Sequence, residues 1–292
     1  MPECFILCAV YNTASMPICH QCRSVVPDQA RFCPFCGVPQ HRSEEEPPFV
    51  DDKGDVEARL VTLFFDSLRR EVTASFPALD MQALTERLYA SGFRDMLHRR
   101  MSQLAEQIKA KNEAWTRSPA TQKKYLLCLF DELIDYFLIR HAADMIPLLL
   151  PESILKYQQH ALTSIDRYAM VMDYMDWSQE KETVYTDFLA MPVDHLRNAS
   201  KYFLFPEKSE RIFFICDQSI FGGCTEGFAI TERGLYWKAP LAKAKRYLFL
   251  DEANLELSKE WLTVNDSFFN AGTTLNYKLF KLLKKMHQLL HL

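Results

Sequence analysis

Apolar residues recur every three or four positions through most of the stretch from residue 56 to residue 198, the spacing of one buried face of an α-helix. Asp80 is placed to cap the start of one helix, and Gly92 to separate it from the next. Ser118 and Pro119 open a further helix, with proline in the first turn, where its missing N–H costs nothing. The pattern therefore predicts a mostly helical middle domain over residues 56–198.

The end of this stretch is predicted to be helical as well. Ser178 is a candidate cap for a helix that carries Val184 and Phe188 and ends at Pro192. No glycine occurs between residues 93 and 221, which favours a helical bundle over a sheet.

The pattern changes in the region from residue 199 to residue 292. Residues 228–231 and 235–238 are short apolar runs that flank Glu232-Arg233-Gly234, which predicts a β-hairpin with Gly234 at a position of positive φ. Further short apolar runs predict strands at 212–216, 246–250, 255–257, 261–264 and 267–270. An amphipathic helix is predicted over 274–291. The region is therefore expected to be an antiparallel β domain closed by one helix.

Four lysines lie largely outside the apolar face of this final helix: Lys278, Lys281, Lys284 and Lys285. We interpret them as a solvent-exposed face. An anionic membrane surface or a nucleic acid is the alternative partner for these four side chains.

Four cysteines near the N-terminus form two pairs with the spacing of metal ligands. Cys19 and Cys22 are separated by two residues, as are Cys33 and Cys36, and ten residues lie between the pairs. Two such turns place four thiolates in a tetrahedron around one Zn²⁺ ion. Because four protein ligands leave no open position, we predict one structural zinc per chain, with iron as the alternative metal.

Five of the nine cysteines in the chain lie outside this motif. Cys4 and Cys8 have a poorer spacing for metal binding, and Cys128, Cys216 and Cys224 are expected to be buried or incidental thiols. Since no secretion signal is recognisable, we do not expect a disulfide framework.

The cysteine motif resembles the short zinc-ribbon domain found at the ends of many bacterial proteins. The matching residues are Cys22, Pro27, Asp28, Ala30, Phe32, Cys33, Pro34, Cys36 and Gly37, and the resemblance covers residues 17–40. Arg23 stands where that family usually has glycine. The resemblance implies a docking cap for protein or nucleic acid.

The C-terminal region is similar to PH-like domains of uncharacterised bacterial proteins. The similarity rests on residues 214–222 and 227–238, and on the order of strands followed by one helix. It implies a binding module without catalytic residues.

The domain organisation follows from length and composition. The 292 residues, of which 48% are hydrophobic, are enough for two sizeable domains and a small module. We predict a multidomain α+β protein with the following parts: an N-terminal extension (1–15), a zinc ribbon (16–41), a linker (42–55), the helical domain (56–198) and the PH-like domain (199–292). Translation beginning at Met16 is an alternative explanation of the extension.

The charge and hydropathy of the chain limit its partners and location. The net charge of −4 provides no global basic field for nucleic acid. No apolar run approaches the roughly 20 residues that span a bilayer, and a cytoplasmic location is expected.

Recognisable catalytic signatures are missing from the sequence, including GxSxG, HExxH and the phosphate-binding GxxxxGK[ST]. Asp131, Glu132, Asp135 and His141 are expected to lie on a solvated helix face. For His98, His160 and His195 a structural or surface position is expected.

These observations favour a non-enzymatic zinc-binding adaptor that docks a protein partner. The alternatives are a nucleic-acid-binding or regulatory protein that uses the ribbon, and an enzyme with an unrecognised site in the helical domain.

Overall fold

The structure is a computed structural model, and it describes residues 24, 35–36, 54–110, 118–158, 164–258 and 260–291. The chain divides into two units, Met1–Pro47 and Pro48–Leu292. The predicted ribbon and linker lie outside the described residues, apart from Ser24, Phe35, Cys36 and the last two residues of the linker. The boundary expected at residue 199 falls inside the second unit.

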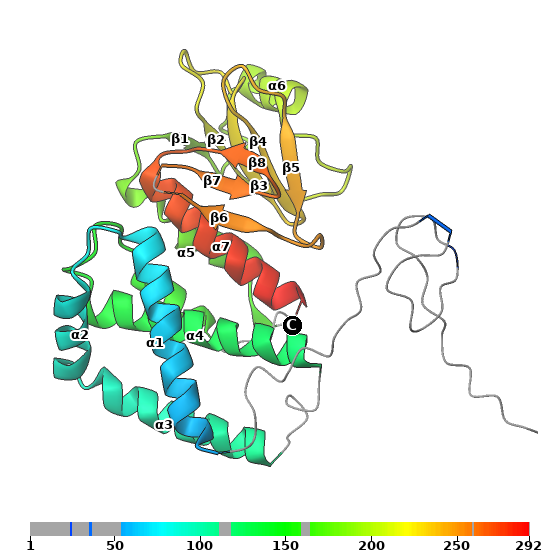
Figure 1. Cartoon of the computed structure of the whole chain (residues 1–292). Coiled ribbons are helices and arrows are strands. Elements are labelled where there is room, and N and C mark those ends of the chain that lie inside the picture. Colours follow the sequence, from blue (N-terminus) through cyan, green and yellow to red (C-terminus); the bar gives the residue numbers. More distant parts are fainter. Residues whose placement is uncertain are drawn as a thin grey trace, which may run out of the picture. The chain divides into compact units, whose positions relative to one another are not determined.

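The first part of the second unit is helical (Figure 1). Its elements are α1 (Val56–Ser75), α2 (Met81–Ala90), α3 (Phe93–Lys109), α4 (Pro119–His141), the 3₁₀ helix η2 (Glu152–Tyr157) and α5 (Arg167–Met175). The predicted caps are confirmed, since the side chain of Asp80 accepts from the Gln82 N–H and that of Ser118 accepts from the Thr121 N–H.

Aromatic packing joins the helices of this layer. The helix α1 buries a stripe of residues at every fourth position, and Phe64 at its centre is fully buried. The Phe64 ring contacts those of Phe93 on α3 and Phe130 on α4, with centroids 6.0 and 5.9 Å apart. Burying one such side chain stabilises the fold by about 1.5–3 kcal/mol.

The prediction of a helix from Ser178 to Pro192 is wrong. This segment forms the short 3₁₀ helix η4 (Trp177–Gln179) and the strand β1 (Thr183–Tyr185). Val184, a β-branched residue, pairs with Cys216 on a strand about thirty positions later in the chain. The next helix, α6 (Val193–Tyr202), begins only after Pro192.

Two antiparallel sheets follow. Four more strands join β1 in a sheet of order β1-β2-β3-β4-β5: β2 (Ile212–Asp217), β3 (Gly227–Thr231), β4 (Gly234–Lys238) and β5 (Lys245–Leu248). A three-stranded sheet contains β6 (Leu255–Leu257), β7 (Leu262–Val264) and β8 (Ser267–Phe269). The sequence therefore predicts β2 to β8 but not β1, and the coarse α+β class is confirmed.

The predicted hairpin is present, but Gly234 has another role than expected. Phe228 on β3 pairs with Trp237 on β4, as the alternation requires. Gly234 does not have a positive φ. A Cβ at this position would lie 2.4 Å from the carbonyl oxygen of Tyr247, so glycine is needed for the close approach of β5.

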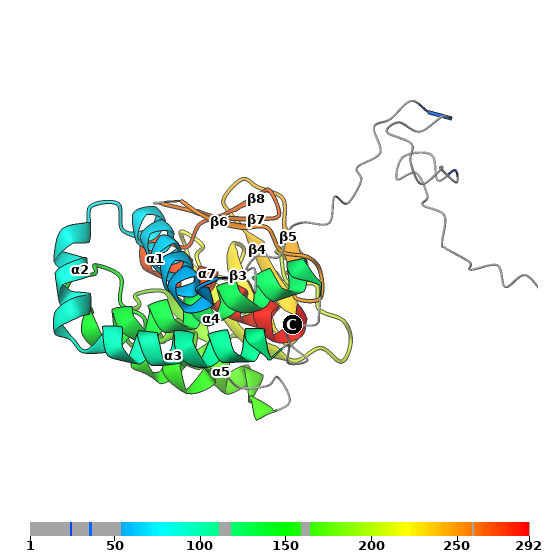
Figure 2. The ribbon, with the colours of Figure 1, turned by 60° about the horizontal axis from the view of Figure 1, so that its bottom comes forward.

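The last helix, α7 (Thr273–His291), lies between the helices and the strands in two views of the molecule (Figures 1 and 2). It contacts α5, β6 and β7. One hydrophobic cluster runs from Val56 on α1 through the strands to Met286 on α7, so the helical and β parts share a core. None of the described helices is long and apolar enough to cross a membrane.

Candidate functional site

The four predicted zinc ligands can be located only in part. Cys19, Cys22 and Cys33 lie outside the described residues. Cys36 is exposed and lies in a turn beside Phe35, which is also exposed. The four-thiolate zinc site therefore stays a prediction from sequence.

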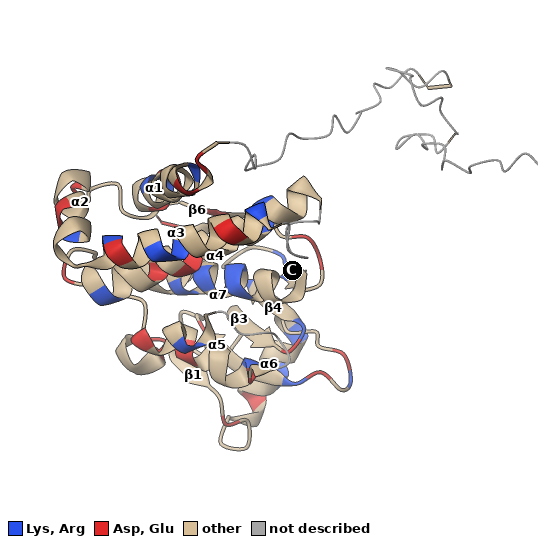
Figure 3. Ribbon diagram, turned by 90° about the horizontal axis from the view of Figure 1, so that it is seen from below, with Lys and Arg blue, Asp and Glu red and all other residues tan. Residues whose placement is uncertain are grey.

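The prediction of a solvent-exposed lysine face on the last helix is wrong. Lys278, Lys281 and Lys285 are buried, with exposed fractions of 3%, 3% and 6%. The side chain of Lys284 is only one quarter exposed. Figure 3 shows the lysine positions of α7 alongside acidic positions of the neighbouring helices. These four side chains are therefore unavailable to a membrane surface or a nucleic acid.

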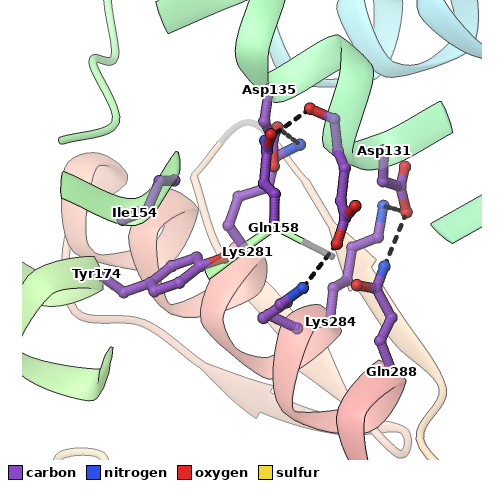
Figure 4. A pocket seen from close by; sticks show the side chains of 10 residues that line it. Asp131, Asp135, Ile154, Gln158, Tyr174, Lys281, Lys284 and Gln288 are labelled. Atoms are coloured by element: carbon purple, nitrogen blue, oxygen red, sulfur yellow. Dashed lines mark hydrogen bonds and ion pairs between the residues drawn. The ribbon is translucent and has the colours of Figure 1, made fainter. Parts of the chain in front are cut away.

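Lys281 is the centre of the arrangement. Its Nζ lies 2.7 Å from Glu71 Oε1 on α1 and 2.7 Å from Asp135 Oδ1 on α4. A buried charge is tolerated only when it is paired and hydrogen-bonded, and here one ammonium meets two carboxylates. The contact joins the last helix to α1 and α4. Figure 4 shows the part of it that Lys281 and Asp135 form.

Further pairs extend this contact along α7. Lys284 Nζ lies 2.9 Å from Asp131 Oδ2, and Lys285 Nζ lies 2.7 Å from Glu132 Oε1. Asp131 and Glu132 were expected on a solvated face of α4, as was Asp135, and that expectation is wrong for all three. Each faces a lysine of α7, which supplies the counter-charge that water would otherwise provide.

Lys278 completes the series at the start of α7. Its Nζ lies 2.6 Å from Glu180 Oε1 and donates to the carbonyl oxygen of Asp176 at 2.9 Å. We call the four lysines of α7 and their acidic partners the ion-pair seam.

The pKa values of the seam reflect burial and pairing. Burial alone would raise the pKa of Glu71, but Lys281 and Lys284 outweigh it and lower the value to about 2. Burial raises the pKa of Asp135, and Lys281 offsets this only in part. The pKa of Lys281 is raised, because the two carboxylates outweigh its own desolvation. Lys281 is therefore charged at neutral pH.

A small cavity of about 20 Å³ lies within the seam, where Gln158 and Tyr174 also line it (Figure 4). That volume admits roughly one water molecule. Because the surrounding carboxylates are already paired with lysines, the seam is better suited to holding helices together than to binding a substrate.

A larger pocket of about 360 Å³ lies between α4, α7 and residues 253–255. The rings of His287 and His291 stack at its edge, with centroids 4.2 Å apart. His287 Nδ1 is buried and has no hydrogen-bond partner among the described residues. Burial, followed by the nearby His291, lowers the pKa of His287, so this ring is neutral at pH 7.

The other expected histidines lie apart from the seam. His141 ends α4 beside the ring of Phe93, and burial lowers its pKa. His98 Nδ1 lies 3.3 Å from Glu57 Oε1. His160 lies outside the described residues. His195 has neighbours that the sequence does not indicate, because the fold brings it near Asp217 and Cys224.

Comparison of the chain with known proteins identifies no relative. No protein-family model matches the chain, and neither a curated protein nor a solved structure matches it.

Proposed function

We propose that the protein is a non-enzymatic zinc-binding adaptor, in which a structural zinc ribbon and a PH-like module dock a protein partner. The observation that carries the proposal is a pair of loops at one end of the larger sheet, each of which presents exposed apolar side chains. The spacing of Cys19, Cys22, Cys33 and Cys36 supports the zinc-binding part.

The order of elements supports a PH-like module. The meander β2–β5 is followed by the three-stranded sheet β6–β8 and then by α7. This is the order of strands and closing helix that the sequence resemblance implies. The module would include β1 and α6 as additions before the meander.

The strand register places the two loops together. Gly227 pairs with Asp217 on one side and with Lys238 on the other, and Trp237 pairs with Lys245. The loops 218–226 and 239–244 therefore leave the sheet at the same end.

The side chains on these loops are suited to a protein partner. Phe221 is 99% exposed and Leu241 is 104% exposed. Exposed aromatic and aliphatic side chains that gather at one end of a domain are typical of protein interaction sites. Lys243 and Lys245 are exposed beside Leu241, so the complementary surface is apolar and acidic. We call this surface the loop end.

The ion-pair seam gives no support to the alternative of an enzyme in the helical region. Asp131, Glu132 and Asp135 are each engaged by a lysine. A general acid or base needs a carboxylate that can reach a substrate, and the cavity here has room only for roughly one water molecule.

The test is affinity capture with the full chain, followed by reconstitution with the purified partner. The double variant Phe221→Ser/Leu241→Ser should weaken binding at least about tenfold, since exposed anchors of this size dominate interfaces. Leu149→Ser, which changes an exposed leucine of the helical part, is the matched control and should bind normally.

Deletion of residues 16–41 separates the roles of the ribbon and the loop end. A partner lost only on that deletion docks on the ribbon, and a partner insensitive to both changes contradicts the proposal. The nucleic-acid alternative predicts a gel shift at low salt, and the absence of a shift there would exclude it.

A further inference from the structure

We propose that His195, Asp217 and Cys224 form a second metal site, which binds a divalent transition-metal ion such as Zn²⁺. The site is separate from the predicted ribbon and draws on none of its cysteines. The three residues come from α6, the end of β2 and the loop before β3.

The geometry of the three donors is suited to one ion. An imidazole nitrogen, a carboxylate oxygen and a thiol sulfur all lie within 4.8 Å of one another. Ligands of one tetrahedral zinc ion lie about 3.5 Å apart, given bonds of about 2.0–2.3 Å. Closing the three donors onto an ion therefore requires side-chain movements of about 1 Å. A fourth position would be left for water.

The charge of Asp217 is the second observation. Asp217 is only 8% exposed. Within the described ranges, no lysine, arginine or histidine forms an ion pair with it. Its carboxylate accepts from the N–H groups of Ser219 and Cys224, at 2.9 and 3.1 Å. Buried carboxylates are usually paired with a cation or coordinate a metal. A divalent ion would supply the missing positive charge.

Hydrogen bonds hold the donors in place before any metal binds. The Asn198 side chain, one helical turn after His195, donates to the carbonyl oxygen of Gly223 at 2.8 Å, which ties α6 to the loop. The Ser219 hydroxyl accepts from the N–H groups of Thr225 and Glu226 and closes the loop. The loop therefore does not have to be ordered at the moment of binding.

Tyr185 orients the histidine. Its hydroxyl lies 2.8 Å from His195 Nδ1, which leaves Nε2 as the nitrogen for a metal. Metal-bound histidines almost always donate from their second nitrogen to a neighbouring oxygen, and loss of that partner weakens metal binding roughly 10–100-fold.

The thiol must lose its proton for the metal to bind. Cys224 is fully buried, and burial followed by the charge of Asp217 raises its pKa to about 12. Without a metal the thiol is therefore protonated. Binding replaces that proton with the ion and releases it to solvent, so affinity should rise with pH. The thiolate and the Asp217 carboxylate together balance the two charges of the ion.

The experiment uses the full chain with the ribbon disabled by Cys33→Ser/Cys36→Ser, and Co²⁺ as the probe. We expect one equivalent of Co²⁺, with the near-ultraviolet absorption of a thiolate–cobalt bond. His195→Asn and Asp217→Asn should each abolish this absorption, and Tyr185→Phe should weaken binding roughly 10–100-fold. Cys216→Ser, which changes the neighbouring buried thiol outside the group, should leave binding unchanged.

Circular dichroism shows whether each variant folds, so that a loss of Co²⁺ binding can be told from a loss of structure. His195 is only partly buried, so His195→Asn is expected to fold. Absence of Co²⁺ binding by the ribbon-disabled chain would overturn the proposal. Binding that persists in folded His195→Asn and Asp217→Asn would overturn it equally, because the three residues would then be a hydrogen-bonded cluster alone.

Discussion

Lys281 Nζ on α7 lies 2.7 Å from Asp135 Oδ1 on α4, although 146 residues separate them in the sequence. Glu71 on α1 lies at the same distance from this ammonium. The last helix is therefore held to the first part of the unit by buried charge as well as by its leucines. Buried pairs of this kind contribute little relative to a well-packed apolar contact, but they are costly to break on one side.

Lys281→Met is expected to destabilise the fold by about 3–5 kcal/mol. The substitution leaves the carboxylates of Glu71 and Asp135 buried without their central cation. Urea unfolding measures the change. Lys109→Met removes an exposed pair on α3, and as a control it should cost less than about 0.5 kcal/mol.

A compensated variant tests the same explanation. Adding Glu71→Gln and Asp135→Asn to Lys281→Met removes the unpaired charges and should recover most of the lost stability. If the triple variant is no more stable than Lys281→Met, the loss comes from packing of the lysine stem and not from charge.

Acid should weaken the fold through Glu71. Its pKa is about 2 in the folded chain against an ordinary 4.5, so its contribution is present above pH 4.5 and is lost as the pH falls toward 2. The shift corresponds to about 3 kcal/mol. Asp135 acts in the opposite direction, since its pKa is raised and the folded state takes up its proton first.

Unfolding measured against pH in the parent chain and in Glu71→Gln checks the sign. The stability difference between the two proteins should shrink steadily between pH 4.5 and pH 2. A difference that stays constant over that range would show that Glu71 does not titrate in the folded state as its contacts imply.

Local signals made part of the fold predictable. The cap at Asp80 depends on residues within one turn, and the hairpin around Glu232-Arg233-Gly234 depends on neighbours in the chain. Such features need no knowledge of distant partners, and both are present. The role of Gly234 was missed because it depends on Tyr247 of a different strand.

Long-range pairing accounts for the errors. In the sequence of the last helix alone, Lys281 and Lys285 look like solvated lysines. The carboxylates that pair with them come from α1 and α4. A matching acidic stripe on α4 is visible in the sequence, but nothing local indicates that the two stripes meet. The sequence likewise gives no link between Cys224 and His195, because they come near each other only when α6 packs on the loop before β3.

Gly227→Ala is expected to cost about 3 kcal/mol or more. Gly227 has φ +137°, and a Cβ there would lie 2.1 Å from the carbonyl oxygen of Cys216 on the paired strand. Gly272 also has a positive φ, of +88°, but faces open space. Gly272→Ala therefore isolates the cost of the left-handed backbone, about 1–2 kcal/mol. Equal losses in urea unfolding would show that β2 and β3 separate enough to admit the methyl group.

Disabling the predicted ribbon should remove zinc without melting the rest of the protein. Four thiolates bind one ion, and in a segment of about 25 residues the metal supplies the folding energy that a core cannot. The chain divides into two units at Pro47 and Pro48, so we expect the fold of the second unit not to depend on that metal. Cys33→Ser/Cys36→Ser should therefore lower the zinc content by one ion per chain and leave the main thermal transition where it is.

Zinc analysis and calorimetry of the same samples test this prediction. An unchanged zinc content would contradict the four-cysteine site, whereas a large fall in the main transition would show that the ribbon is part of the folded core and not a separate module.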